Sequence, residues 1–215
     1  MHTLKTIWES VVDMTKRKVV VIEGFSGRSI EDVAGKLFAN LEGLDLEVIP
    51  VEHMSYKGIV QRLWHASKIE KFAEQAHPTI KNLTDKDFLI LYSMGNLVGR
   101  YAIEKIGIKG NPTVLLAGGP HLGCNWKYAP LFMVPCIRQM LPGSSFLQEL
   151  GLPKNDSYWY LVANNDKKVS VKSACPVKTD QVRHFNCGHR LFDHQPCLEY
   201  IDEIIISEKI STTIK

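Results

Sequence analysis

Short apolar runs alternate along the chain with longer stretches in which apolar residues recur every three or four positions. The short runs predict strands at 19–22, 46–51, 88–92, 113–117, 158–163 and 182–185. The periodic stretches predict helices at 33–41, 59–72, 97–106 and 196–205, the second of them ending before Pro78. This alternation is typical of an α/β fold with a mostly parallel, doubly wound sheet and helices on both faces. Ligand sites in such folds lie at the carboxyl ends of the strands.

The composition favours one globular domain. The 215 residues are 45% hydrophobic and 23% charged, which is enough apolar material for one core. We assign residues 18–208 to this domain and residues 1–17 to an amphipathic N-terminal segment. The net charge of +3 is too small to indicate nucleic-acid binding.

Three further features concern location. No stretch reaches the roughly 20 consecutive apolar residues of a membrane-spanning helix. The N-terminal segment also lacks the apolar core of a signal peptide. The five cysteines are an odd number without a C-x-x-C pair, which fits reduced thiols better than a disulfide framework. We therefore expect a cytoplasmic protein.

Ser93 stands between a predicted strand and a predicted helix with no loop residues to spare. A serine in that setting, with a glycine two residues later at Gly95, is typical of a nucleophile elbow. The tight turn would expose the serine hydroxyl and aim the N–H of Met94 at an oxyanion. Taken alone, the same pattern fits a serine that caps the helix.

Several segments resemble lipases and esterases of the α/β-hydrolase superfamily. Y-S-M-G-N-L-V at 92–98 is similar to the family's H-S-M-G-G-L-V, with Asn96 in place of the second glycine and Leu91 where the family has a small residue. Further similar segments follow in the family's order, at 118–123, 140–150, 163–169 and 187–196. The resemblance runs from about residue 19 to 205 and implies the α/β-hydrolase fold.

The resemblance also implies an acid and a base for Ser93. Asp166 occupies the position of the family's acid, and His189 that of the histidine before the closing helix. The chemistry is consistent, because a serine hydroxyl needs an imidazole to take its proton and a carboxylate to orient that imidazole. A plain turn aspartate is the alternative interpretation of Asp166, and His194 is the rival base if His189 points away.

A metal site is the other interpretation of this region. His184, Cys187, His189 and His194 lie close together in the sequence, but their spacing fits no zinc motif, so we expect no metal and no cofactor. The loop at 23–27 resembles the family's oxyanion loop, which assigns the second oxyanion donor to the N–H of Phe25, beside that of Met94. Glu23 stands where the family has histidine, and because a carboxylate would oppose an oxyanion, we expect Glu23 to be turned away or paired. This loop lacks the glycine and lysine spacing of a phosphate-binding P-loop.

The insertion at about 122–157 is unusually apolar and should form a small cap over the site. Its residues Trp126, Leu131, Phe132 and Met133 are the candidate substrate contacts, which favours apolar acyl groups and allows peripheral membrane contact. Alternatively, these residues complete the core. The function predicted by the resemblance is a carboxylic-ester hydrolase acting on small-molecule or lipid esters. The alternatives are a thioesterase or amidase of the same fold, or an inactive lipid- or partner-binding protein; the oligomeric state stays open.

Overall fold

The computed structural model describes residues 17–25, 35–37, 46–51, 67–125 and 134–213. Within these ranges, the strands are β1 (Arg17–Ile22), β2 (Leu46–Val51), β3 (Phe88–Tyr92), β4 (Thr113–Ala117), β5 (Tyr158–Ala163) and β6 (Val182–Phe185). They form one sheet in the order β2-β1-β3-β4-β5-β6, and every neighbouring pair is parallel. The predicted α/β fold is confirmed, and each predicted strand is found.

The strand order explains where a ligand site can form. After β1 the chain crosses to β2 on one side and then returns to β3 on the other side of β1. The connections therefore leave the carboxyl ends of β1 and β3 in opposite directions, which opens a crevice between them. Ile22 and Leu91 pair across these two strands next to that crevice.

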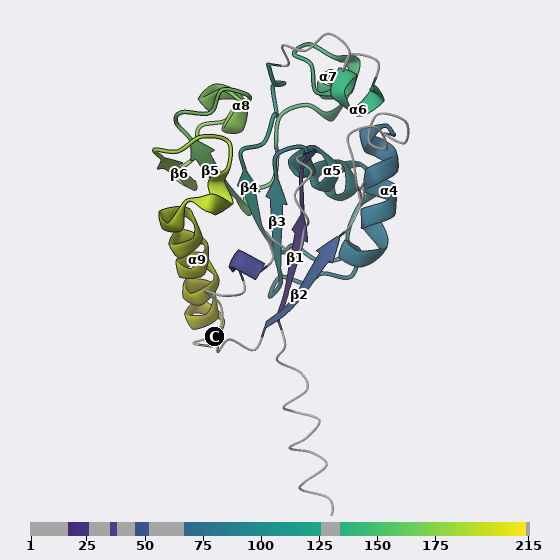
Figure 1. Ribbon diagram of the computed structural model, residues 1–215. Coiled ribbons are helices and arrows are strands. Elements are labelled where there is room, and N and C mark those ends of the chain that lie inside the picture. The colour runs from purple at the N-terminus through teal and green to yellow at the C-terminus, as the bar shows by residue number, and fades with distance from the viewer. Residues whose placement is uncertain (1–16, 26–34, 38–45, 52–66, 126–133, 214–215) are drawn as a thin grey trace, which may run out of the picture.

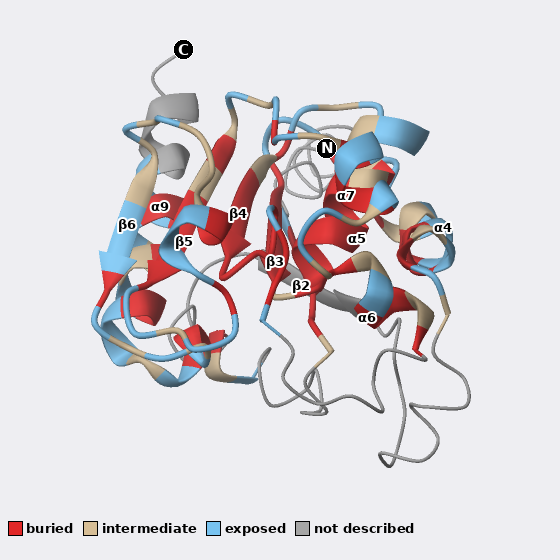
Figure 2. Cartoon of the chain, turned by 90° about the horizontal axis from the view of Figure 1, so that it is seen from above, coloured by how far each residue is buried: buried red, intermediate tan, exposed pale blue. Residues whose placement is uncertain are grey.

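The centre of the sheet is buried on both faces because β3 is apolar at every position and β1, β4 and β5 are apolar over most of their length, as parallel strands usually are. Val20, Leu89 and Leu116 belong to the core on one face, and the alternate residues Val21 and Ile90 belong to the core on the other. Figure 2 shows the central strands buried, while exposed residues lie on the outer surfaces of α4 and β6.

The helices cover both faces. In the described ranges they are α4 (Ile69–Ile80), α5 (Gly95–Tyr101), the π-helical turn η1 (Ala102–Ile106), α6 (Pro135–Gln139), α7 (Ser145–Leu150), α8 (Val171–Ala174), the 3₁₀ turn η3 (Leu191–Asp193) and α9 (Gln195–Thr213). Figure 1 shows α4 and α5 on one side of the sheet and α9 on the other. None of these helices is long and apolar enough to cross a lipid bilayer. Most of the predicted helix at 33–41 lies outside the described residues.

The predicted end of a helix before Pro78 is wrong. Helix α4 contains Pro78 and continues to Ile80. Pro78 lies in the last turn, so its missing N–H removes one hydrogen bond of the helix and its ring disturbs few residues beyond it. Ile80 is fully buried in the core, as is Ile69 at the other end of α4, and this burial stabilises the last turn.

The described part of the 122–157 insertion packs on the rest of the domain. The Cys124 N–H donates to the carbonyl of Met140 at 2.9 Å, which closes the base of the insertion. Ile137 and Leu147, from α6 and α7, are buried in the same core as α4 and α5. Figure 1 shows α6 and α7 beyond the carboxyl ends of the strands. These two helices therefore contribute to the core at the edge of the sheet where the site would lie.

Candidate active site

Ser93 occupies a strained turn between β3 and α5. Its φ of 53° is positive, and among the described residues no other non-glycine residue has a positive φ. The Ser93 N–H donates to the carbonyl of Ala117, the last residue of β4, at 2.9 Å. Backbone angles of this kind cost a non-glycine residue on the order of 1–3 kcal/mol, so the surrounding structure must hold them. Such strain is characteristic of a nucleophile elbow.

Two glycines let the end of β1 lie directly against this turn. A Cβ atom on Gly95 would lie 2.3 Å from the carbonyl oxygen of Ile22, and one on Gly24 would lie 2.5 Å from the Cβ of Ser93. Neither distance is sterically allowed. The backbones of β1 and of the turn therefore touch at the crevice between β1 and β3.

Leu91 departs from the family's small residue without disturbing the turn. Its side chain is fully buried on the face that carries α5. A Cβ atom on Gly99 of α5 would lie 2.4 Å from a methyl group of Leu91. The absence of a side chain at Gly99 thus provides the space that Leu91 fills.

Asn96, the second departure, ties the turn to the sheet. Its side-chain amide Nδ2 donates to the carbonyl of Ser93 at 2.9 Å and to that of Ala117 at 3.0 Å. Asn96 is completely buried. A glycine at this position could make neither hydrogen bond. The side chain of Asn96 therefore stabilises this turn by joining it to the end of β4.

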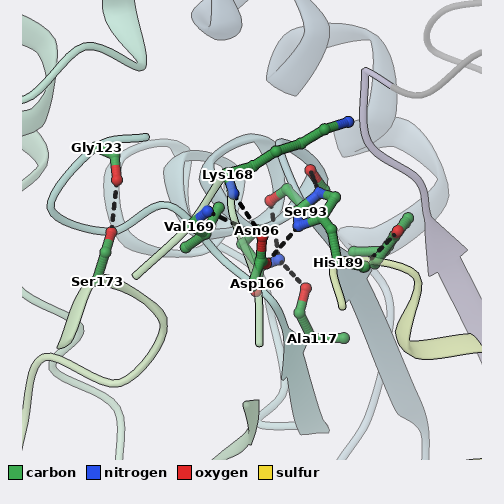
Figure 3. Close-up of polar contacts among 10 residues, drawn as sticks. Ser93, Asn96, Ala117, Gly123, Asp166, Lys168, Val169, Ser173 and His189 are labelled. Atoms are coloured by element: carbon green, nitrogen blue, oxygen red, sulfur yellow. Dashed lines mark hydrogen bonds and ion pairs between the residues drawn. The ribbon is translucent and has the colours of Figure 1, made fainter. Parts of the chain in front are cut away.

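The three residues singled out in the sequence lie together at the carboxyl ends of the strands (Figure 3). Ser93 Oγ lies 2.8 Å from Nε2 of His189. Nδ1 of His189 lies 2.6 Å from Oδ2 of Asp166. The hydroxyl, the imidazole and the carboxylate thus form one continuous chain of hydrogen bonds, although 96 residues separate Ser93 from His189.

Asp166 is held by its own loop. Its second carboxylate oxygen, Oδ1, accepts the backbone N–H groups of Lys168 at 2.8 Å and Val169 at 3.1 Å. Burial acts to raise the pKa of Asp166, but the hydrogen bond and charge of His189 together with these N–H groups outweigh it, and the pKa lies below its usual value. Asp166 is therefore ionised at neutral pH.

The loop of His189 is anchored to β3 and to the loop of Asp166. The hydroxyl of Tyr92 donates to the backbone carbonyl of His189 at 2.8 Å. The Asn165 N–H donates to the carbonyl of Cys187 at 3.0 Å, which joins the loops that follow β5 and β6. The His189 side chain is 12% exposed, so most of the imidazole is shielded from solvent.

A pocket opens beside Ser93. It is lined by Phe25, Ser93, Pro120, Cys124, Met140, Lys168, Val169 and His189. Phe25 and Met94, the predicted oxyanion donors, flank the serine from the β1 loop and from the start of α5, where the first N–H groups of a helix have no partner within it. Trp126, Leu131, Phe132 and Met133, the predicted substrate contacts, lie outside the described residues.

Comparison with known proteins identifies the fold. No protein-family model matches the chain, and no curated protein matches it in sequence. Among solved structures, an esterase from Exiguobacterium antarcticum is 13% identical with a TM-score of 0.58, over 89% of this chain and 92% of the esterase. A type II thioesterase of the yersiniabactin biosynthetic pathway is 15% identical with a TM-score of 0.57, over 90% of this chain and 93% of the thioesterase. The chain has the α/β-hydrolase fold.

A larger relative of the same fold is lipase B from Aspergillus fumigatus. It is 14% identical to this chain, with a TM-score of 0.55 over 80% of this chain. The matched region is 44% of the lipase, so this chain spans less than half the length of that enzyme.

The alternative metal cluster is not assembled. His184 Nδ1 lies 3.0 Å from Oδ1 of Asn164, and the ring of His194 packs against Phe185. Within the described ranges, no group of three or more His, Cys, Asp or Glu side chains is placed to hold a metal ion. His194, the rival base, is not the hydrogen-bond partner of Ser93, which is His189. The ring of His194 instead packs edge-on against Phe185 of β6.

A buried ionic network around Arg100 of α5 was not predicted from the sequence. Arg100 is fully buried and binds both carboxylate oxygens of Glu104, at 2.8 and 3.0 Å, and the carbonyl of Gly151 at 3.0 Å. Its NH1 group also lies 3.3 Å from Nδ1 of His121. Burial and then the charge of Arg100 hold the pKa of His121 well below its usual value, so His121 is neutral and structural. The i,i+4 spacing of Arg100 and Glu104 was the available signal.

Proposed function

We propose that this α/β-hydrolase-fold protein is a serine hydrolase that cleaves carboxylic esters, with Ser93 as nucleophile, His189 as general base and Asp166 as the acid that orients it. The observation that carries the proposal is the unbroken relay from Ser93 Oγ through His189 to Asp166, with contacts of 2.8 and 2.6 Å. A hydroxyl on a strained turn with an imidazole in hydrogen-bond reach is the arrangement that nucleophilic catalysis requires.

The reaction would proceed through an acyl-enzyme. Ser93 Oγ attacks the ester carbonyl carbon while its proton passes to Nε2 of His189. The tetrahedral intermediate carries a negative oxygen, for which the N–H groups of Met94 and Phe25 are the proposed donors. Collapse of the intermediate expels the alcohol, which takes the proton from His189. Water then attacks the acyl-enzyme by the same route in reverse and regenerates Ser93.

Asp166 makes His189 an effective base. Its carboxylate accepts the N–H at Nδ1, which leaves Nε2 free of a proton and facing Ser93. When His189 takes up the serine proton, the ionised carboxylate 2.6 Å away stabilises the imidazolium. The lowered pKa of Asp166 supports this role, because the carboxylate stays charged throughout the cycle.

The lining of the pocket supports an apolar acyl group. Phe25, Pro120, Cys124, Met140 and Val169 present carbon or sulfur beside the serine. Burying an acyl chain against such a surface contributes roughly 25 cal/mol for each Å² removed from water. We further propose that Trp126, Leu131, Phe132 and Met133 extend this surface from the cap. A thioesterase is the second candidate, supported by the structural likeness to the type II thioesterase.

A non-catalytic binding role is less well supported. A site that had lost its activity would be under no requirement to keep three reacting groups within hydrogen-bond distance of one another. Here all three are present, and both departures at the elbow, Leu91 and Asn96, are accommodated by their surroundings.

The test is turnover of p-nitrophenyl esters of several chain lengths, together with labelling by a fluorophosphonate probe. We expect Ser93→Ala to lose labelling and to reduce kcat by at least about 10³-fold while the protein stays folded. Ser145→Ala is the matched control, since Ser145 is an exposed serine on α7 that does not line the pocket. Wild-type protein that neither hydrolyses the esters nor takes up the probe would refute the proposal, as would full activity of Ser93→Ala.

A further inference from the structure

Lys168 brings a positive charge to the pocket that contains Ser93. Both residues line it, and of the lining residues Lys168 alone has a permanently charged side chain. Figure 3 shows this side chain extended from the Asp166 loop, on the same side of the site as Ser93, with the ammonium nitrogen at its end. The remaining lining residues, apart from Ser93 and His189, are apolar.

The backbone of Lys168 is fixed from both sides. Its N–H donates to Asp166 at 2.8 Å, and its carbonyl accepts the N–H of Asn125 at 2.8 Å. The next residue, Val169, is buried. Since these contacts hold the peptide groups, the point from which the side chain leaves the backbone is set by the same loop that positions the catalytic acid.

Among the described residues, no hydrogen bond or ion pair engages the ammonium group of Lys168. Two other cations do have carboxylate partners: Arg100 pairs with Glu104, and Lys36 pairs with Asp193. No described carboxylate forms an ion pair with Lys168, whose side chain is exposed. A cation at the edge of an apolar pocket, without a carboxylate partner in the part of the chain that the structure describes, is available to a ligand.

We propose that Lys168 makes this site select esters or thioesters that carry an anionic group, a carboxylate or a phosphate, near the scissile carbonyl. The inference rests on the proposed function and names the substrate class for it. Asp166 places a negative charge behind His189, and this charge alone would repel an anionic substrate. Lys168, two residues away in the same loop, offsets this repulsion and attracts the anion to the pocket.

The expected effect is modest because the ammonium is exposed. Exposed ion pairs change an equilibrium by at most about fivefold, and salt screens them over a Debye length of about 10 Å at 0.1 M. A preference that derives from Lys168 must therefore weaken as the ionic strength rises.

Two pairs of esters locate the anion. Mono-p-nitrophenyl adipate and p-nitrophenyl hexanoate have the same chain length but differ by a carboxylate on the acyl side. The hexanoate ester of 4-hydroxybenzoate and that of its methyl ester differ by a carboxylate on the leaving group. For each pair the measured quantity is the ratio of kcat/KM for the anionic ester to kcat/KM for the neutral one, which cancels the intrinsic reactivity of the esters when variants are compared.

The variants are Lys168→Gln, Lys168→Arg and the matched control Lys167→Gln, since Lys167 is an exposed neighbour that does not line the pocket. We expect Lys168→Gln to lower the ratio about three- to fivefold in at least one pair at low salt, whereas Lys168→Arg and Lys167→Gln retain it. Glutamine keeps the backbone N–H that binds Asp166, so the catalytic acid stays in place.

The outcomes separate the two levels of the proposal. A fall confined to the adipate pair places the anion on the acyl side, and a fall confined to the hydroxybenzoate pair places it on the leaving group. Turnover of the neutral esters with ratios that Lys168→Gln leaves unchanged in both pairs overturns the role of Lys168 but not the hydrolase activity. Absence of any ester turnover by the wild-type protein overturns both.

Discussion

The two halves of the proposed site are built in different ways. Ser93 lies where the backbones of β1, β3 and α5 meet. These backbones can approach because Gly24 and Gly95 have no side chain to keep them apart. Asp166 and His189 instead lie on loops after β5 and β6 that are largely exposed. Hydrogen bonds hold these loops, from Lys168 and Val169 to Asp166 and from Tyr92 to His189.

This contrast predicts two modes of failure. On the serine side, position depends on packing, so a change that disturbs the turn must also disturb the core. On the acid–base side, position depends on a few polar contacts worth about 1 kcal/mol each, so a change there can impair catalysis while the fold survives. Substitutions on each side test whether the two halves differ in this way.

The largest expected effect is on the acid–base side. Asp166→Asn keeps the shape of the side chain but presents a group that no longer fixes the tautomer of His189 or stabilises its protonated form. We expect kcat to fall by about 10⁴-fold, the scale seen for this change in other Ser-His-Asp sites, with little loss of folded protein. Ester turnover and far-UV circular dichroism measure the two quantities. Asp156→Asn, at an exposed aspartate outside the pocket, serves as the control and should behave as wild type.

The stability of Asp166→Asn relative to wild type should also depend on pH in the acid range. The pKa of Asp166 is lowered on folding, so its ionised form stabilises the folded state above the unfolded pKa of about 3.9. This contribution is lost as the pH falls through the lower, folded value. The difference in unfolding free energy between wild type and Asp166→Asn should therefore shrink as the pH falls below about 4. A difference that grows as the pH is lowered below about 4 would contradict the contacts described for Asp166.

The next largest effect is on the serine side and is an effect on folding. Gly95→Ala places a Cβ atom 2.3 Å from the carbonyl oxygen of Ile22, so the backbones must separate. We expect a loss of about 3 kcal/mol in the free energy of unfolding, with ester turnover lost in parallel. Gly35→Ala is the control, because a Cβ atom at Gly35 meets nothing within 4 Å. Gly35 lies in the helical segment 35–37, so this variant should stabilise the protein by up to about 1 kcal/mol, since alanine favours a helix. Equal stability of the two variants in urea unfolding would show that β1 and the turn are not in contact.

The sequence predicts much of this arrangement because its signals are local. Apolar runs predicted the strands, and the placement of Ser93 directly after a strand predicted the turn that its φ of 53° shows. The fit between Leu91 and Gly99 could not be predicted, because it depends on how closely α5 packs on β3. The same holds for helix α4, in which burial of Ile80 outweighs the local effect of Pro78.

The position of Lys168 at the pocket also could not be predicted from the sequence. The motif that marks Asp166 predicts a loop, but which of its neighbours points toward the serine depends on the contacts of that loop with the rest of the chain. One of these contacts is the hydrogen bond from the Asn125 N–H to the carbonyl of Lys168, which joins two segments that lie far apart in the sequence. Contacts at such separations leave no periodic signal in either segment.

The smallest expected effect concerns the residue that connects the two halves. Tyr92 is the last residue of β3, next to Ser93, and its hydroxyl holds the backbone of the His189 loop at 2.8 Å. Tyr92→Phe removes this hydrogen bond and keeps the ring that packs on Phe192. We expect kcat to fall about three- to tenfold, corresponding to about 1 kcal/mol, because His189 is then less firmly aligned with Ser93.

Tyr101→Phe is the matched control for this change. Tyr101 lies on α5, its ring stacks on Phe146, and it does not line the pocket. If the acid–base side depends on hydrogen bonds, Tyr92→Phe should lower kcat more than Tyr101→Phe does while KM for a p-nitrophenyl ester stays similar. The opposite result would be a Tyr92→Phe variant whose unfolding free energy is lower by several kcal/mol but whose folded fraction keeps the kcat of the wild type. Tyr92 would then support packing. The proposed distinction between a packed nucleophile and a hydrogen-bonded base would not extend to the residue that joins them.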